Sequence, residues 1–161
     1  MVNDGLIPMR YPSQKNLGLV GKWVKTANEE ELDELERQLC KTNLKYLCTQ
    51  ILKFKDWDVF HDELVEWQSQ STGKRFRLYL LPRGHLKTSI ITIAKTIQDI
   101  LIDPDTMILI SSSVAGNARA FLSEIKEYIT NKSDIPHLFG AFVNDRDWNQ
   151  DSIVIRQRKK P

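Results

Sequence analysis

The hydrophobic and polar positions along the chain change their period twice. Residues 1–27 show no apolar period and contain several glycines and prolines, so we expect an irregular N-terminal arm. From residue 28 to residue 73, apolar residues recur every three to four positions, which predicts a helical region. Asn28 is a suitable cap for its first helix, and the acidic residues 29–31 suit the positive end of a helix. The apolar positions are Leu32, Leu35, Leu39, Leu44, Leu47, Cys48, Ile51 and Leu52, then Phe60, Leu64 and Trp67 on one core-facing side of a helix over residues 56–69.

From residue 74 onward the pattern predicts strands alternating with helices. Residues 75–81, RFRLYLL, alternate and are rich in strand formers, and residues 107–111, MILIS, form a continuous apolar run. A helix is expected between them over residues 88–101, and residues 152–158 predict one more strand. The order strand, helix, strand indicates an α/β fold with a buried parallel sheet. The expected inward positions are Ile90, Ile93, Ala94, Ile97 and Leu101 in the first helix, and Ala118, Phe121, Leu122, Ile125 and Tyr128 or Ile129 in a second helix over residues 117–129.

Composition limits the class of protein without choosing a function. The 161 residues, of which 41% are hydrophobic, suffice for one globular domain with a buried core. No apolar run reaches the length of about 18 residues that a membrane span needs, and the first residues lack the layout of a signal peptide, so a cytosolic protein is expected. The net charge of +2 is too small to indicate nucleic acid by itself. Cys40 and Cys48 lack the spacing of a zinc site and are expected to be buried in helices.

The hexad RGHLKT, Arg83–Thr88, lies between the first predicted strand of this region and the helix that follows it. A phosphate-binding loop occupies this position, because its backbone N–H groups and the positive end of the next helix face the same anion. The strict pattern G-x-x-x-x-G-K-[ST] is not met, since Leu80 and Leu86 stand at its two glycines. Gly84 is therefore expected to carry the backbone freedom of the turn. A turn with a solvated lysine and a capping threonine is the alternative.

An ordered series of segments extends from about residue 60 to residue 158. It consists of FHDEL at 60–64, LYLLPRGHLKTS at 78–89, DPDTMILISSS at 103–113, NARAFLSEIKEYI at 117–129, HLFG at 137–140 and DWNQDSIVIRQR at 147–158. This series resembles the large terminase subunit of tailed bacteriophages, the motor ATPase that packages DNA into the procapsid. Members of that family carry a variant Walker A motif with an arginine four residues before the lysine, and Arg83 and Lys87 have this spacing.

The resemblance implies a role for each residue of the loop. Lys87 would contact the β and γ phosphates of ATP, Thr88 would ligate Mg²⁺, and Arg83 would sense or stabilise the γ phosphate, so that Arg83 and Lys87 are the catalytic candidates. His61 stands where relatives often carry a glutamine that contacts adenine, although a capping or packing histidine is the alternative there. The nucleotide-binding set implied is Arg83, Gly84, His85, Leu86, Lys87, Thr88 and Ser89, with His61 added.

The resemblance also implies an architecture and a setting. It predicts a P-loop NTPase of the RecA/ASCE-like type, a parallel sheet flanked by helices and preceded by a helical region. The expected divisions are an arm over 1–27, a helical lead-in over 28–73 and the first part of the ATPase domain over 74–161. The strand with the catalytic Asp-Glu pair and the nuclease domain are expected beyond Pro161, so this part of the protein would bind ATP without hydrolysing it. The implied partners are double-stranded DNA, the portal protein, the small terminase subunit and further copies in a ring, commonly of five, at the procapsid portal vertex in the host cytoplasm.

Two other functions stay open. The same order of segments fits the first RecA-like lobe of a helicase or another translocase. A non-enzymatic protein with a degenerate loop, which uses its helical region to dock partners, also fits. Trp57, Trp67 and Trp148 are candidates for stacking on bases, with burial in the core as the alternative for Trp67. The basic run 156–160 is expected to be a solvated chain end, although contact with DNA phosphates is the alternative.

Overall fold

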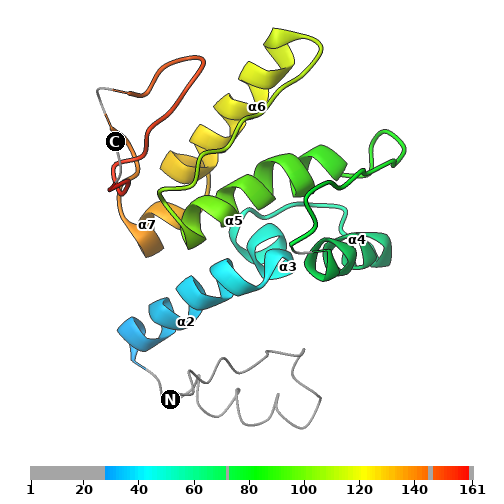
Figure 1. Ribbon diagram of the computed structural model, residues 1–161. Coiled ribbons are helices and arrows are strands. Elements are labelled where there is room, and N and C mark those ends of the chain that lie inside the picture. Colours follow the sequence, from blue (N-terminus) through cyan, green and yellow to red (C-terminus); the bar gives the residue numbers. More distant parts are fainter. Residues whose placement is uncertain (1–27, 72, 145–146, 160–161) are drawn as a thin grey trace, which may run out of the picture. The chain divides into compact units, whose positions relative to one another are not determined.

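The computed structural model describes residues 28–71, 73–144 and 147–159 (Figure 1). The predicted arm over 1–27 and Lys160, in the basic run, lie outside the described residues. The chain divides into two units, Met1–Leu35 and Glu36–Pro161. In the first unit, Asn28 caps the helix as predicted, because its Oδ1 accepts the N–H of Glu31 at 2.8 Å and Glu31 Oε2 accepts the N–H of Asn28 at 3.0 Å. This reciprocal pair satisfies two N–H groups at the start of α2 (Glu29–Thr42).

The second unit is built from helices joined by extended or irregular segments. Three of these helices, labelled η, have the wider turns of a π-helix and continue an α-helix directly or lead into one. After α2 the elements are α3 (Leu44–Tyr46), η1 (Leu47–Ile51), α4 (Val59–Gln70), η2 (Thr88–Ala94), α5 (Lys95–Ile102), α6 (Ala115–Glu127), η3 (Tyr128–Lys132) and α7 (Ile135–Phe139).

The predicted parallel sheet is wrong, because the described residues contain helices and no strand. The backbone of residues 75–81 and 107–111 makes no hydrogen bond to the backbone of another segment among the described residues. The third predicted strand forms one isolated antiparallel bridge, between Trp148 and Ile153. A P-loop fold of the α/β class is therefore not what these residues form. The alternation of residues indicates which side chains of an extended segment face inward and which face outward. It does not indicate whether neighbouring strands are present, and a sheet needs strands that form hydrogen bonds to each other.

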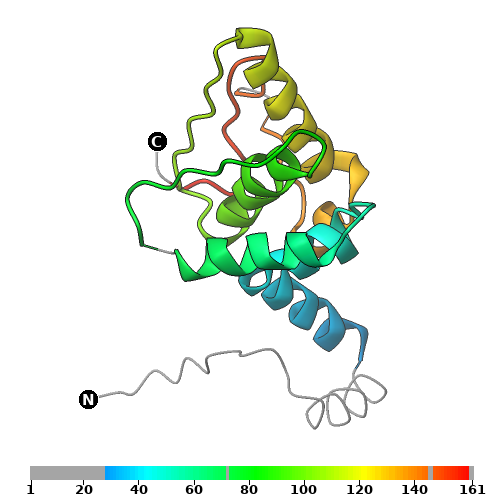
Figure 2. The same cartoon turned by 90° about the vertical axis from the view of Figure 1, so that its right-hand side faces the viewer.

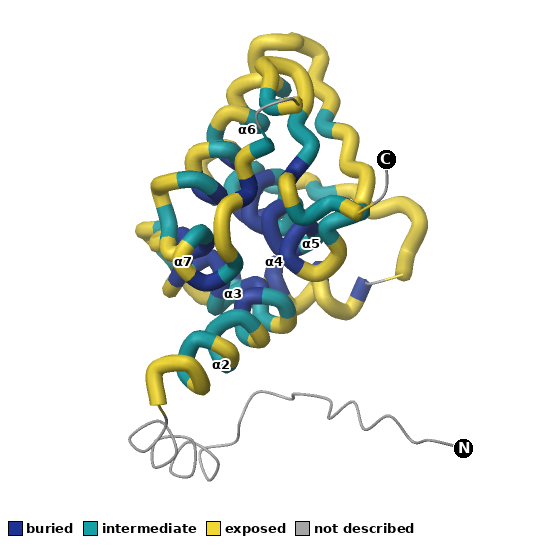
Figure 3. Tube along the Cα trace, turned by 90° about the vertical axis from the view of Figure 1, so that its left-hand side faces the viewer, coloured by how far each residue is buried: buried dark blue, intermediate teal, exposed yellow. Residues whose placement is uncertain are grey.

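The helix formed by η2 and α5 lies at the centre of the second unit (Figures 1 and 2). Its π-helical part contacts η1 on one side and α6 on another. The predicted stripe is confirmed, since all five of its members are buried. Gln98 on α5 also donates a hydrogen bond from Nε2 to the carbonyl oxygen of Cys40, at 3.3 Å. The core is therefore made by one apolar helix that other helices enclose, as the dark blue positions in Figure 3 indicate.

An apolar cavity of about 80 Å³ lies between α5, α6 and the segment over residues 106–110. Ile108 and Ile110 face it from the extended segment, and Ile100, Leu122 and Ile125 face it from the two helices. Ile153, Val154 and Ile155 complete the lining on the remaining side.

The predictions that the two cysteines and Trp67 are buried have different outcomes. Cys40 and Cys48 are buried as expected. Burial is the main cause that raises the pKa of each thiol to about 12, so neither is a candidate nucleophile. Trp67 was expected in the core but is 44% exposed, with its ring in edge-to-face contact with Tyr79 at a centroid distance of 4.9 Å.

None of the described helices combines the length and the apolar character that crossing a membrane requires.

Candidate phosphate-binding site

The turn between residues 82 and 86 uses left-handed backbone at two positions. Gly84 has φ = +82° and Leu86 has φ = +48°. Glycine adopts this conformation freely, whereas a leucine pays roughly 1–2 kcal/mol for it. Leu86 packs against the hydrophobic core, which offsets that cost. The expectation that Gly84 alone would carry the unusual backbone is therefore incomplete, because Leu86 shares it.

The turn ends in a helix whose first N–H groups have no cap. Lys87 precedes η2 without a side-chain hydrogen bond to the helix, and the first backbone bond of the helix is Ile90 N–H to Leu86 O at 2.8 Å. Among the described residues, the backbone N–H groups of Lys87, Thr88 and Ser89 have no acceptor. Unpaired N–H groups at the positive end of a helix attract an anion. The threonine-cap alternative is not what is observed.

The side chain of Lys87 folds back across the turn. Its Nζ reaches the carbonyl oxygen of Leu81, the last residue of the extended segment, at 3.4 Å. This is a long hydrogen bond to a neutral acceptor, so an anionic oxygen would replace it at little cost. The ammonium group has no carboxylate partner among the described residues, and neither does the exposed guanidinium of Arg83.

His85 anchors the turn at two points. Its Nδ1 lies 3.0 Å from the carbonyl oxygen of Arg83. Its ring also meets the ring of Phe60 edge-to-face, with the centroids 5.7 Å apart. Phe60 belongs to α4, so this contact ties the exposed turn to a helix of the core. Nothing in the sequence pattern indicated that these two residues meet.

The stretch of chain that contains the turn carries charge of one sign. No aspartate or glutamate occurs between residues 67 and 98, and this stretch carries six lysines and arginines. Among the described residues only Lys95 of these six has an ion-pair partner, Asp99. Arg83 and Lys87, the two of these cations that lie in the turn itself, create a positive potential that attracts anions. The absence of acidic residues can be read from the sequence, and it is the signal that motif matching missed.

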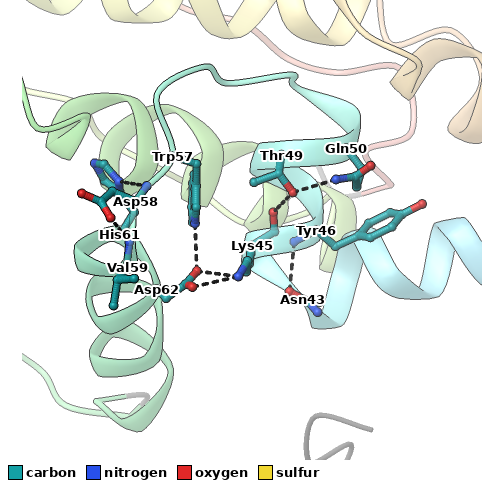
Figure 4. Close-up of polar contacts among 10 residues, drawn as sticks. All are labelled: Asn43, Lys45, Tyr46, Thr49, Gln50, Trp57, Asp58, Val59, His61 and Asp62. Carbon is teal, nitrogen blue, oxygen red and sulfur yellow. Dashed lines mark hydrogen bonds and ion pairs between the residues drawn. The ribbon is translucent and has the colours of Figure 1, made fainter. Parts of the chain in front are cut away.

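His61 is buried and takes part in the capping box of α4, as in the alternative to adenine contact that was given for this residue. It is 6% exposed, and its Nδ1 accepts the N–H of Asp58 at 2.9 Å in the capping box of α4 (Figure 4). The proton of the neutral ring therefore lies on Nε2, which is buried and has no partner among the described residues. Contact between His61 and adenine stays a prediction, and it would require this buried Nε2 to become accessible.

A polar network holds α3 against α4 (Figure 4). Asp62 accepts hydrogen bonds from Trp57 Nε1 at 2.8 Å and from Lys45 Nζ at 2.8 Å. Burial opposes ionisation of Asp62, but the hydrogen bonds from Lys45 and Trp57 outweigh it and hold the pKa of the carboxyl below its usual value. The network fixes the N-terminal part of α4, which carries Phe60 and His61.

Metal ligands are sparse in the part of the chain that the structure describes. It contains no group of three or more histidine, cysteine, aspartate or glutamate side chains that could hold a metal ion. The Thr88 hydroxyl lies in the first turn of the uncapped helix, where it can supply one oxygen ligand to a Mg²⁺ ion that arrives with a nucleotide.

The structure therefore brings Arg83 to Ser89 together in one positive turn and leaves His61 buried in the helix beside it. No family model, no curated protein and no solved structure matches this chain.

Proposed function

We propose that the turn Arg83–Ser89 binds the phosphates of ATP and that the chain is the ATP-binding part of a viral DNA-packaging motor of the terminase type. The uncapped start of η2 carries the first half of this proposal, because the free N–H groups of residues 87–89 lie beside unpaired cations. The ordered motif series described above supports the second half. The proposal needs no parallel sheet, since the turn and the helix alone supply the donors.

Each residue of the turn has a chemical task in this proposal. The ammonium of Lys87 leaves the Leu81 carbonyl and binds oxygens of the β and γ phosphates. The backbone N–H groups of residues 87–89 donate to the same phosphates, and the Thr88 hydroxyl coordinates the accompanying Mg²⁺. Arg83 binds the γ phosphate in this proposal, because its planar guanidinium suits phosphate oxygens. Hydrolysis is not assigned to these residues.

Titration of the chain with ATP and Mg²⁺ in a calorimeter tests the binding site. Lys87→Ala removes a charge-assisted hydrogen bond worth roughly 1.5–3 kcal/mol, so we expect the affinity to fall about 10- to 100-fold. Lys95→Ala is the matched control, because Lys95 lies on the same helix but pairs with Asp99, and its affinity should equal that of the wild type. Equal affinity of the wild type and Lys87→Ala would refute the site.

A second titration addresses the motor. In a DNA-packaging motor the binding of nucleotide and of DNA are linked, so ATP affinity should change when short double-stranded DNA is added. A non-catalytic docking protein predicts no such change. If ATP binding depends on Lys87 but does not change when DNA is added, the phosphate-site proposal stands and the packaging-motor proposal is refuted.

A further inference from the structure

Two extended segments expose apolar side chains along one side. In the segment over residues 74–81, which we call the basic edge, Phe76, Leu78 and Leu80 are 75–83% exposed. In the segment over residues 103–111, the acidic segment, Met107 and Leu109 are 83% and 91% exposed. Tyr79, Leu81 and Ile110 are partly buried and pack against the core, whereas Arg77 and Ile108 are exposed. Each segment therefore carries exposed apolar side chains beside positions that pack against the core, a kind of surface that marks a binding site.

The backbone of both segments is equally unpartnered. Within the described residues, the stretches 75–81 and 107–111 take part in no backbone hydrogen bond with another segment. A row of free N–H and C=O groups beside exposed alternating apolar side chains is a template for another extended chain. An apolar helix would cover the side chains but would leave these backbone groups unpaired.

The charges at the two segments are opposite. The basic edge carries Lys74, Arg75 and Arg77, none of which has an ion-pair partner among the described residues. The acidic segment begins with Asp103 and Asp105, and because Asp105 already accepts a hydrogen bond from the N–H of Lys159 at 2.7 Å, Asp103 is the carboxylate on which the attraction to the basic edge depends. Like charges keep two basic edges apart, whereas a basic edge attracts an acidic segment.

From these three observations we infer that the basic edge of one copy of this chain binds the acidic segment of a second copy. The two backbones pair along residues 75–80 and 107–111. Phe76, Leu78 and Leu80 then lie beside Met107 and Leu109 of the second copy, and Asp103 lies near the basic end of the edge. The interaction does not depend on phosphate binding at residues 83–89, so the two proposals fail separately.

Single-stranded nucleic acid is the other occupant to consider. An open groove at the basic edge is lined by Trp67, Lys74, Phe76 and Arg77, and aromatic rings with cations suit nucleotides. Two observations favour polypeptide. Leu78 and Leu80 offer no ring for a base to stack on, and the unpaired backbone groups match another backbone better than they match bases.

Sedimentation equilibrium of the whole chain over a range of concentrations is the first measurement. We expect reversible self-association of the wild type. The double variants Leu78→Lys/Leu80→Lys and Met107→Asp/Leu109→Asp should each weaken it at least tenfold. All four side chains are largely exposed, so both variants should keep the wild-type circular dichroism and melting temperature. Val59→Gln changes an exposed apolar residue on α4 and serves as the control with unaltered association.

Mixing the two double variants distinguishes this specific pairing from non-specific association. The Leu78→Lys/Leu80→Lys copy keeps an intact acidic segment, and the Met107→Asp/Leu109→Asp copy keeps an intact basic edge. A fluorescently labelled sample of one should therefore bind the other at least tenfold more tightly than either binds itself. Amide hydrogen exchange at high concentration should show new protection at residues 75–80 and 107–111 in the wild type.

Four outcomes would overturn the inference. They are a wild type that stays monomeric at its highest soluble concentration, double variants that associate as the wild type does, a mixture that recovers no binding, and protection that arises in other segments. Binding of a fluorescein-labelled oligothymidylate by a monomeric wild type, lost in Arg75→Gln/Arg77→Gln, would assign the surface to nucleic acid instead.

Discussion

The helix η2–α5 and the extended segments over 75–81 and 107–111 are all rich in apolar residues but have opposite environments. In the helix, the backbone groups beyond the first turn find their partners within the same segment, so the apolar stripe only has to be covered by neighbouring helices. In the extended segments, both the backbone groups and the outer side chains depend on a second chain segment. The apolar pattern of a segment therefore indicates its conformation and which of its side chains face inward. It does not indicate whether another segment is present to cover the remaining side chains and to pair with the backbone.

The largest expected effect comes from truncating one apolar side chain in each region. Ile97→Ala removes a fully buried side chain from α5 and should lower the free energy of unfolding by about 2–4 kcal/mol. Leu109→Ala removes a side chain that is almost fully exposed and should change the free energy of unfolding by less than about 0.5 kcal/mol. Urea denaturation at low protein concentration measures both. Similar losses in the two variants would show that the extended segments are covered in solution.

A smaller effect is expected where the turn meets the helix. Gly84→Ala adds a Cβ that meets no atom within 4 Å, so its cost comes only from the left-handed backbone and should be about 1 kcal/mol. Chemical denaturation measures this loss. Gly116→Ala is the control, because Gly116 also has open space around it but lies inside α6, where alanine is favoured, so that variant should be slightly more stable than the wild type.

The smallest effect concerns the ion pair between α3 and α4. Since hydrogen bonds lower the pKa of Asp62 in the folded state, its contribution to stability is fully present above the unfolded pKa and is lost as the pH falls through the folded pKa. Both side chains are more than a third exposed, so Asp62→Asn should cost less than about 1 kcal/mol at pH 7. Thermal melts at pH 7 and pH 3 should show a smaller difference between variant and wild type at the lower pH. A difference that grows at pH 3 would contradict this role.

Local patterns in the sequence predicted the helices well. The Asn28 cap and the buried stripe that contains Ile93 and Ile97 follow from capping chemistry and helical period, which act within a few residues. The sheet could not be predicted in this way, because pairing depends on segments far apart in the sequence. Trp67 was placed in the core by its period, but it lies at the exposed edge of α4, where only part of its ring meets Tyr79.

The candidate site was predicted in part. The position of Lys87 at the start of a helix follows from the motif and its context. The positive φ of Leu86 and the contact between His85 and Phe60 arise from tertiary packing, so no local pattern contained them. The burial of His61 follows from its place at the third position of a capped helix, where its ring accepts the N–H of Asp58.

The apolar cavity beneath residues 106–110 has a mechanical consequence. Close-packed interiors resist compression, whereas the pocket of about 80 Å³ that Ile108 and Ile110 face is not filled by side chains. Hydrostatic pressure acts first where unfilled space is eliminated. Pressure should therefore alter the packing beneath the segment that presents Met107 and Leu109 before it alters the filled core around Ile97.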